Sequence, residues 1–125
     1  MHSLKLSNLQ KTWIIDIDGT IFPHNGYLSG ELEKPLEGVE RFFKNLKPGN
    51  FIILLTSRSQ NYRISTEKSL AMAGIEYDLL LMDMPTGERI LINDAKPSGL
   101  VTAISICINR DDGLKDINIT QSDEL

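Results

Sequence analysis

The chain has 125 residues, a net charge of −4 and 41% hydrophobic residues, which fits one globular domain with its own core. An acidic chain lacks the basic surface that attracts nucleic acids or anionic membranes, so we expect neither as a partner. Its single cysteine, Cys107, excludes an internal disulfide, and we expect a buried structural thiol. The sequence contains no apolar run long enough to span a membrane and no signal-peptide core, which predicts a cytoplasmic protein.

Five short apolar segments predict the strands. Residues 13–17 and 51–55 are continuous apolar runs, as expected for strands of a parallel sheet that are buried on both faces. Residues 79–82, 89–93 and 103–108 predict the third, fourth and fifth strands. Polar residues or turn signals follow these runs, so we expect short strands that end at defined points.

Two helices are predicted between the first three strands. The first begins at Pro35 and buries one face, because its apolar residues recur at steps of three and four. These residues are Leu36, Val39, Phe42, Phe43 and Leu46. A Pro-Gly-Asn turn at residues 48–50 ends this helix. The second predicted helix covers residues 60–73 and ends at Gly74, which serves as its C-terminal cap.

The remaining segments are predicted to be less regular. Residues 1–11 are expected to form a loose lead-in or a short edge strand, residues 21–34 a turn-rich flap, and residues 109–125 a polar, flexible tail. Alternation of strands and helices predicts the α/β class, in a Rossmann-like three-layer α/β/α arrangement with a mainly parallel sheet. We expect one domain over residues 1–125, with its core in roughly residues 12–110.

Polar side chains follow three of the predicted strands. Asp16 and Asp18 close the first strand, Thr56 and Ser57 follow the second, and Asp94 ends the fourth. Ligands of open parallel sheets bind at this edge, where the carboxyl ends of the strands meet. Two acids at the end of a buried strand need a cation to balance their negative charge. Mg²⁺ is the simplest candidate, because it prefers one or two carboxylates together with phosphate oxygens.

Three motifs in this order resemble the haloacid dehalogenase (HAD) superfamily. Residues 16–20, Asp-Ile-Asp-Gly-Thr, resemble its first motif, DxDGT, which is a specific signal after an apolar run. Residues 54–58, Leu-Leu-Thr-Ser-Arg, are similar to the second motif, an apolar strand ending in Ser or Thr. Residues 91–94, Leu-Ile-Asn-Asp, are similar to the fourth. The resemblance spans roughly residues 12–110 and implies no separate cap domain, because only 37 residues separate one motif from the next.

The resemblance implies phosphoryl transfer through an aspartyl-phosphate. Asp16 would be the nucleophile, and Asp18 would protonate the leaving group and then activate water. Side chains two residues apart lie on the same side of an extended chain, so both can reach one phosphorus atom. Mg²⁺ would be held by Asp16, by Asp18 through its backbone carbonyl, and by Asp94. Thr56, Ser57 and neighbouring backbone N–H groups would bind phosphoryl oxygens.

The sequence departs from the family pattern at two points. The third motif is a Lys or Arg that balances the nucleophile and phosphate charges, and the expected position holds Met84-Pro85 instead. Lys96 is the first substitute, with Arg89, Lys68 and Arg58 as alternatives. Asn93 stands where a two-Asp fourth motif has an acid, and the single acid that follows it still leaves a workable metal site.

The resemblance therefore implies a Mg²⁺-dependent phosphatase for a phosphate monoester, with a sugar phosphate or related small metabolite as the expected substrate. An open site without a cap suits a bulky substrate or closure by a neighbouring subunit of a homo-oligomer. Two alternatives stay open: a phosphatase for a macromolecular phosphate end, and a non-catalytic module that binds phosphate or Mg²⁺. A receiver domain is disfavoured, because its acceptor Asp lies at a later strand end.

Overall fold

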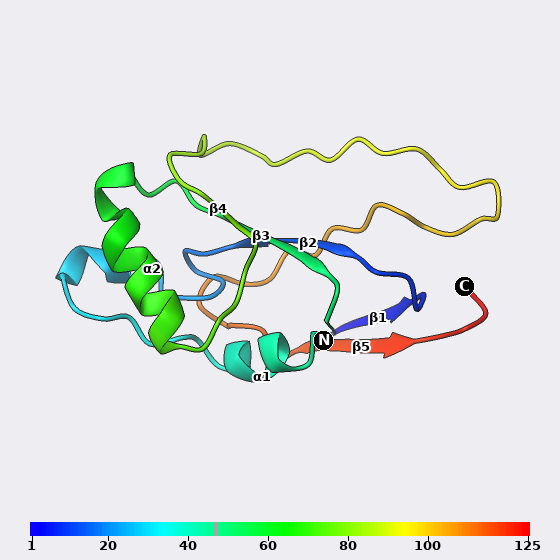
Figure 1. Cartoon of the computed structure of the whole chain (residues 1–125), viewed down its shortest axis with the longest axis horizontal. Helices are drawn as coiled ribbons and strands as arrows, with labels where there is room; N and C mark the ends of the chain where they lie inside the picture. The colour runs from blue at the N-terminus through cyan, green and yellow to red at the C-terminus, as the bar shows by residue number, and fades with distance from the viewer. Residues whose placement is uncertain (47) are drawn as a thin grey trace.

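The computed structural model describes residues 1–46 and 48–125, which form two small parallel sheets and two α-helices (Figure 1). One sheet has the strand order β2-β3-β4, and β1 pairs with β5 in the other. The strands are β1 (His2–Leu6), β2 (Thr12–Asp16), β3 (Phe51–Leu55), β4 (Leu79–Leu81) and β5 (Ile117–Gln121). This arrangement confirms the α/β class and the parallel pairing of the first three predicted strands.

The core lies on one face of the three-stranded sheet. Ile15, Leu54 and Leu80 are buried there, with Leu70 of α2 (Arg63–Met72) in the same cluster. α1 (Val39–Lys44) packs on this face as well, since the rings of Phe42 and Trp13 meet edge to face at 5.6 Å. The two α-helices therefore lie on the same side of the sheet, where they bury the apolar side chains of the neighbouring strands.

Both helices are shorter than predicted. α1 begins at Val39 rather than near Pro35, because Gly38 has a positive φ of 81°, which a right-handed helix cannot include. In the second predicted helix, residues Gln60–Tyr62 form a 3₁₀ turn (η2) and α2 starts at Arg63. Its predicted end is confirmed, because Gly74 follows the helix in the left-handed region. None of the helices in residues 1–46 and 48–125 is long and apolar enough to cross a membrane.

The prediction of strands at 89–93 and 103–108 was wrong. Residues 85–108, here called the arm, run out from the sheet and double back without regular secondary structure (Figure 1). Its two halves are joined at Thr102 by two hydrogen bonds. The Thr102 hydroxyl donates to the Asp94 carbonyl, and the Thr102 carbonyl accepts from the side-chain amide of Asn93. These are side-chain contacts and not a backbone ladder. Cys107 on the arm is exposed, which corrects its predicted burial.

The two ends of the chain form a sheet of their own. β1 pairs in parallel with β5, from His2 beside Ile117 to Leu6 beside Gln121. The expectation of a flexible tail was therefore wrong for residues 117–121, and the edge-strand alternative for the lead-in is confirmed. The physical reason is alternation: Leu4, Ile117 and Ile119 are partly buried while their neighbours are exposed, the pattern of a strand with one covered face.

The flap predicted over residues 21–34 is irregular, as expected. It contains one short 3₁₀ turn, η1 (Gly26–Ser29), which lies between two residues with positive φ, Asn25 and Gly30. The ring of Tyr27 in this turn meets Tyr62 edge to face at 4.8 Å. The flap therefore packs against the segment that follows β3.

Candidate functional site

The loop after β2 turns sharply and carries both predicted catalytic acids. The Ile17 carbonyl accepts hydrogen bonds from the backbone N–H groups of residues 20, 21 and 22, at 2.9–3.2 Å. Gly19 has a φ of 78° and donates its N–H to the Phe22 carbonyl at 2.7 Å. A side chain at Gly19 would also lie 3.2 Å from Cγ of Arg110. The Gly in the motif is thus needed both for the turn and for this close approach.

Asp16 ends β2 with its carboxylate half-open to solvent. Its Oδ1 lies 2.7 Å from Nη1 of Arg89, and its Oδ2 accepts a 3.1 Å hydrogen bond from the Thr20 hydroxyl. The Asp16 side chain is 35% exposed and the Arg89 side chain 39%. An attacking oxygen must be reachable from solvent, and this carboxylate meets that requirement while a cation balances its charge.

Asp18 points to the end of β3 and is held by two partners. Its Oδ1 accepts from Nε of Arg58 at 3.0 Å, and its Oδ2 accepts from the Thr56 hydroxyl at 2.6 Å. The structure thus brings Asp18 and Thr56 together, as the sequence predicts. Thr56 is fully buried, and its oxygen also accepts the backbone N–H of Arg58 at 3.0 Å. Its hydroxyl proton is directed at Asp18 and not at an external phosphate.

Arg58 is buried under the loop that carries the acids. Both of its terminal nitrogens bond Glu33, at 2.7 and 2.8 Å, and Nη1 also bonds the Thr66 hydroxyl at 3.0 Å. With the bond to Asp18, four of its five N–H donors have acceptors. Its guanidinium carbon lies 4.4 Å from the centre of the Tyr27 ring. The burial of this charge is therefore offset by two carboxylates and an aromatic face.

A further acid lies beside the motif loop. The backbone N–H of Asp111 donates to the Gly19 carbonyl at 2.9 Å, and its carboxylate accepts the backbone N–H of His24 at 2.8 Å. Asp111 has a φ of 67°, an uncommon conformation that Asp tolerates better than most residues. It ties the returning end of the arm to the loop that carries Asp16 and Asp18.

Three of the predicted site residues are placed differently from Asp16, Asp18 and Thr56. Ser57 is exposed next to Thr56. Asp94 and Lys96 lie exposed on the arm, and Asp94 is tied to Thr102 there. Among residues 1–46 and 48–125, no three His, Cys, Asp or Glu side chains are grouped closely enough to hold a metal ion. The predicted set of Asp16, Asp18 and Asp94 is thus not assembled, because the segment before Asp94 does not join the sheet as a strand.

Two residues of the site were missed or ranked too low. Arg89, only an alternative in the sequence prediction, contacts Asp16 from the first part of the arm, whereas Lys96, the first choice, is exposed further along it. Glu33 was not singled out, although it is the main partner of the buried Arg58. An available signal was the Arg that directly follows Thr-Ser at a strand end, since a buried Arg requires an acid from elsewhere in the chain.

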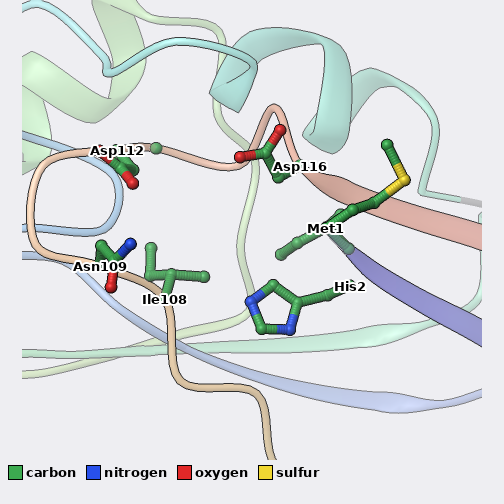
Figure 2. A pocket seen from close by; sticks show the side chains of 8 residues that line it. Met1, His2, Ile108, Asn109, Asp112 and Asp116 are labelled. Atoms are coloured by element: carbon green, nitrogen blue, oxygen red, sulfur yellow. The ribbon is translucent and has the colours of Figure 1, made fainter.

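Two cavities lie away from these acids. One of about 90 Å³ is lined by the chain start and the loop before β5, including His2, Asn109 and Asp112 (Figure 2). A larger one of about 560 Å³ lies between α1 and β5 and is lined by Trp13, Phe42 and Ile119, among others. Neither lining includes Asp16 or Asp18. The two acids therefore lie at the carboxyl edge of the strands and not in either cavity.

Comparison with known proteins adds one structural relative. No family model matches the sequence, and no curated protein matches it. The chain is similar to a chain in the solved structure of a Pnkp1/Rnl/Hen1 complex, with 35% sequence identity and a TM-score of 0.52. The match covers 66% of this chain and 31% of that one, so the present chain corresponds to less than a third of the neighbour's length.

Proposed function

We propose that this chain is a Mg²⁺-dependent phosphatase of the HAD type that hydrolyses a phosphate monoester through an aspartyl-phosphate on Asp16. The observation that carries the proposal is the separation of roles in the DxD motif. Asp16 is accessible and paired with Arg89, whereas Asp18 is fixed by Arg58 and Thr56. The three-layer arrangement of the HAD fold belongs to the same proposal, with the two helices as one outer layer and the opposite face of the sheet open to a further layer.

The chemistry follows from these positions. An Asp16 carboxylate oxygen forms a bond to phosphorus while the bond from phosphorus to the leaving oxygen breaks. Asp18 gives the leaving oxygen a proton, then takes one from the water that attacks the phosphorus and releases Asp16. Both oxygens of Asp18 are engaged in the ligand-free arrangement, so its contact with the Thr56 hydroxyl has to open for proton transfer. Arg89 lies where it can share its charge between Asp16 and a phosphoryl oxygen.

Magnesium fits the site in part. The two acids at one strand end are the donor chemistry that Mg²⁺ prefers, and Asp16 with the Asp18 carbonyl would hold the ion. A bound ion would neutralise charge on the phosphoryl oxygens. The remaining ligands would be water and substrate, because Asp94 lies on the arm, away from the two acids.

The substrate class divides into two candidates. A sugar phosphate or related metabolite is the first, and it rests on the resemblance to the HAD superfamily. A phosphate at the end of a macromolecule is the second, and the position of Asp16 outside both cavities favours it. The similar chain belongs to a complex of several proteins, which agrees with a large substrate or partner, while the net charge of −4 disfavours nucleic acid.

The test is hydrolysis of an aryl phosphate by the purified chain with and without Mg²⁺. We expect activity that EDTA removes, and that Asp16→Asn lowers by a factor of about 10³ or more, since the nucleophile is lost. Asp83→Asn is the matched control, because Asp83 follows β4 by two residues and its carboxylate accepts the backbone N–H of Gln60. Activity that is indifferent to EDTA and to Asp16→Asn would leave the non-catalytic module as the better reading.

A further inference from the structure

One face of the three-stranded sheet is apolar and uncovered. The strand register aligns Ile14, Ile53 and Leu79 across the sheet, and it places Leu55 beside Leu81. Side chains two residues apart share a face, so this row lies opposite the face on which the helices pack. We call it the apolar sheet face; its members are Ile14, Phe51, Ile53, Leu55, Leu79 and Leu81. Ile14 on β2 is 50% exposed and Leu79 on β4 is 45% exposed, whereas parallel sheets are usually covered on both faces.

The arm is the second exposed apolar element. Its large apolar side chains are exposed, with Ile90 at 81% and Ile92 at 91%. The other exposed apolar residues of the arm are Leu91, Val101 and Ile104. Within the part of the chain that the structure describes, the backbone of residues 88–108 makes one backbone hydrogen bond, from Gly99 to Lys96. An extended, apolar segment with unpaired backbone groups favours packing or pairing with another chain.

These two surfaces together approach the size of a protein interface. Nine large apolar residues on them are 37–91% exposed. At on the order of 100 Å² of side chain each, their exposed parts amount to roughly 500 Å² per chain. Backbone and flanking atoms add to this area, and a stable interface takes about 800 Å² from each partner. Covering the sheet face and the arm therefore needs a partner of about the size of a protein domain.

We propose that the apolar sheet face and the arm form the interface of a homodimer, in which the arm of each copy packs on the sheet face of the other. Every copy carries both surfaces, so a two-fold contact covers all of them at once. No charged residue interrupts Ile90–Ile92 or the middle of the sheet face, and the charged residues of the arm flank this apolar run: Glu88 and Arg89 before it, Asp94 and Lys96 after it. A nucleic acid or an anionic membrane would instead select basic residues here.

Sedimentation and light scattering of the wild-type chain test this proposal. We expect a dimer whose dissociation constant rises at least tenfold in Ile92→Asp, because the substitution puts a charge in the interface. Ile64→Asp is the matched control: Ile64 is 79% exposed on α2, outside both surfaces, so the same change should leave the dimer intact. Since Ile92 touches solvent in the single chain, circular dichroism should show that both variants fold.

A probe on the arm gives a second readout. In a Cys107→Ser background, Ile92→Cys carries an environment-sensitive fluorophore, whose emission should shift to the blue as the protein concentration rises through the dimer range. A chain that stays monomeric at about 100 μM, well above typical dissociation constants of specific dimers, overturns the proposal. A blue-shifted probe in a chain that sediments as a monomer also overturns it, because the arm would then pack on its own sheet. Loss of the dimer in Ile64→Asp but not in Ile92→Asp would place the interface elsewhere.

Discussion

Glu33 bonds both terminal nitrogens of Arg58, at 2.7 and 2.8 Å, and so ties the flap to the end of β3. The Arg58 side chain is fully buried and the Glu33 side chain is 5% exposed. Because Arg58 also bonds Asp18, the Glu33–Arg58 pair holds the carboxylate of the second acid of the motif in place. Glu33, a flap residue 25 positions before Arg58 in the sequence, thus acts through Arg58 to set the position of the candidate acid/base.

Glu33→Ala tests this pair. Removing one partner of a buried ion pair leaves an uncompensated charge, so we expect the free energy of unfolding to fall by about 3 kcal/mol. Urea denaturation measures it. Glu37→Ala is the control, since Glu37 pairs with Lys115 on an exposed surface and should leave the unfolding midpoint unchanged within error. Equal effects of the two substitutions would mean that the Arg58 network does not stabilise the fold.

Arg89 and Lys96 can be ranked by activity. Since Arg89 contacts Asp16 and Lys96 lies exposed further along the arm, Arg89→Ala should lower kcat/KM for an aryl phosphate by a factor of about ten or more, the size expected for one charge-assisted bond. Lys96→Ala should change it less than about twofold. This order reverses the one that the sequence suggested. A larger loss in Lys96→Ala would show that Lys96 reaches the acids during turnover.

Local sequence patterns predicted β2, β3 and β4 well, because each is a continuous apolar run with polar residues at its end. The same kind of run at 89–93 did not form a strand. Strand formation needs a neighbouring backbone edge, and an apolar run contains no information about whether an edge is within reach. β5 was missed for the opposite reason, since its polar alternation resembles a surface tail until β1 pairs with it.

The residues of the candidate site likewise divide into those that local sequence predicts and those that depend on distant contacts. Asp16, Asp18 and Thr56 were predicted because motif spacing and strand ends are local features. Glu33 and Arg89 come from distant loops, and their partners are fixed only by tertiary contacts that span 25 and 73 residues. Spacing along the sequence carries no signal for such pairs, so the cation beside Asp16 was assigned first to Lys96.

Tyr77 provides a test at alkaline pH. Burial, helped by the charge of Glu67 and opposed by Arg63, raises the pKa of Tyr77 above its ordinary 10.0. Above that ordinary value the unfolded chain loses this proton while the folded chain keeps it, so stability falls as the pH rises through this window. Below it, the residue contributes no pH dependence. Tyr77→Phe should make the fall shallower in urea unfolding, and it should remove a component that titrates above pH 10.0 from the tyrosinate absorbance titration. A titration unchanged by Tyr77→Phe would contradict this assignment.

Gly38 is predicted to accept no side chain. It has a φ of 81° at the start of α1, and a Cβ atom would lie 2.5 Å from backbone atoms of Lys115, in the loop before β5. Gly38→Ala should therefore lower the free energy of unfolding by about 2–4 kcal/mol, through strain and overlap together. Gly74→Ala separates the two causes, because Gly74 has a φ of 72° but nothing within 4 Å of an added Cβ. Strain alone should cost about 1 kcal/mol there. If both variants lose the same amount in urea unfolding, the contact between α1 and the loop at Lys115 does not contribute.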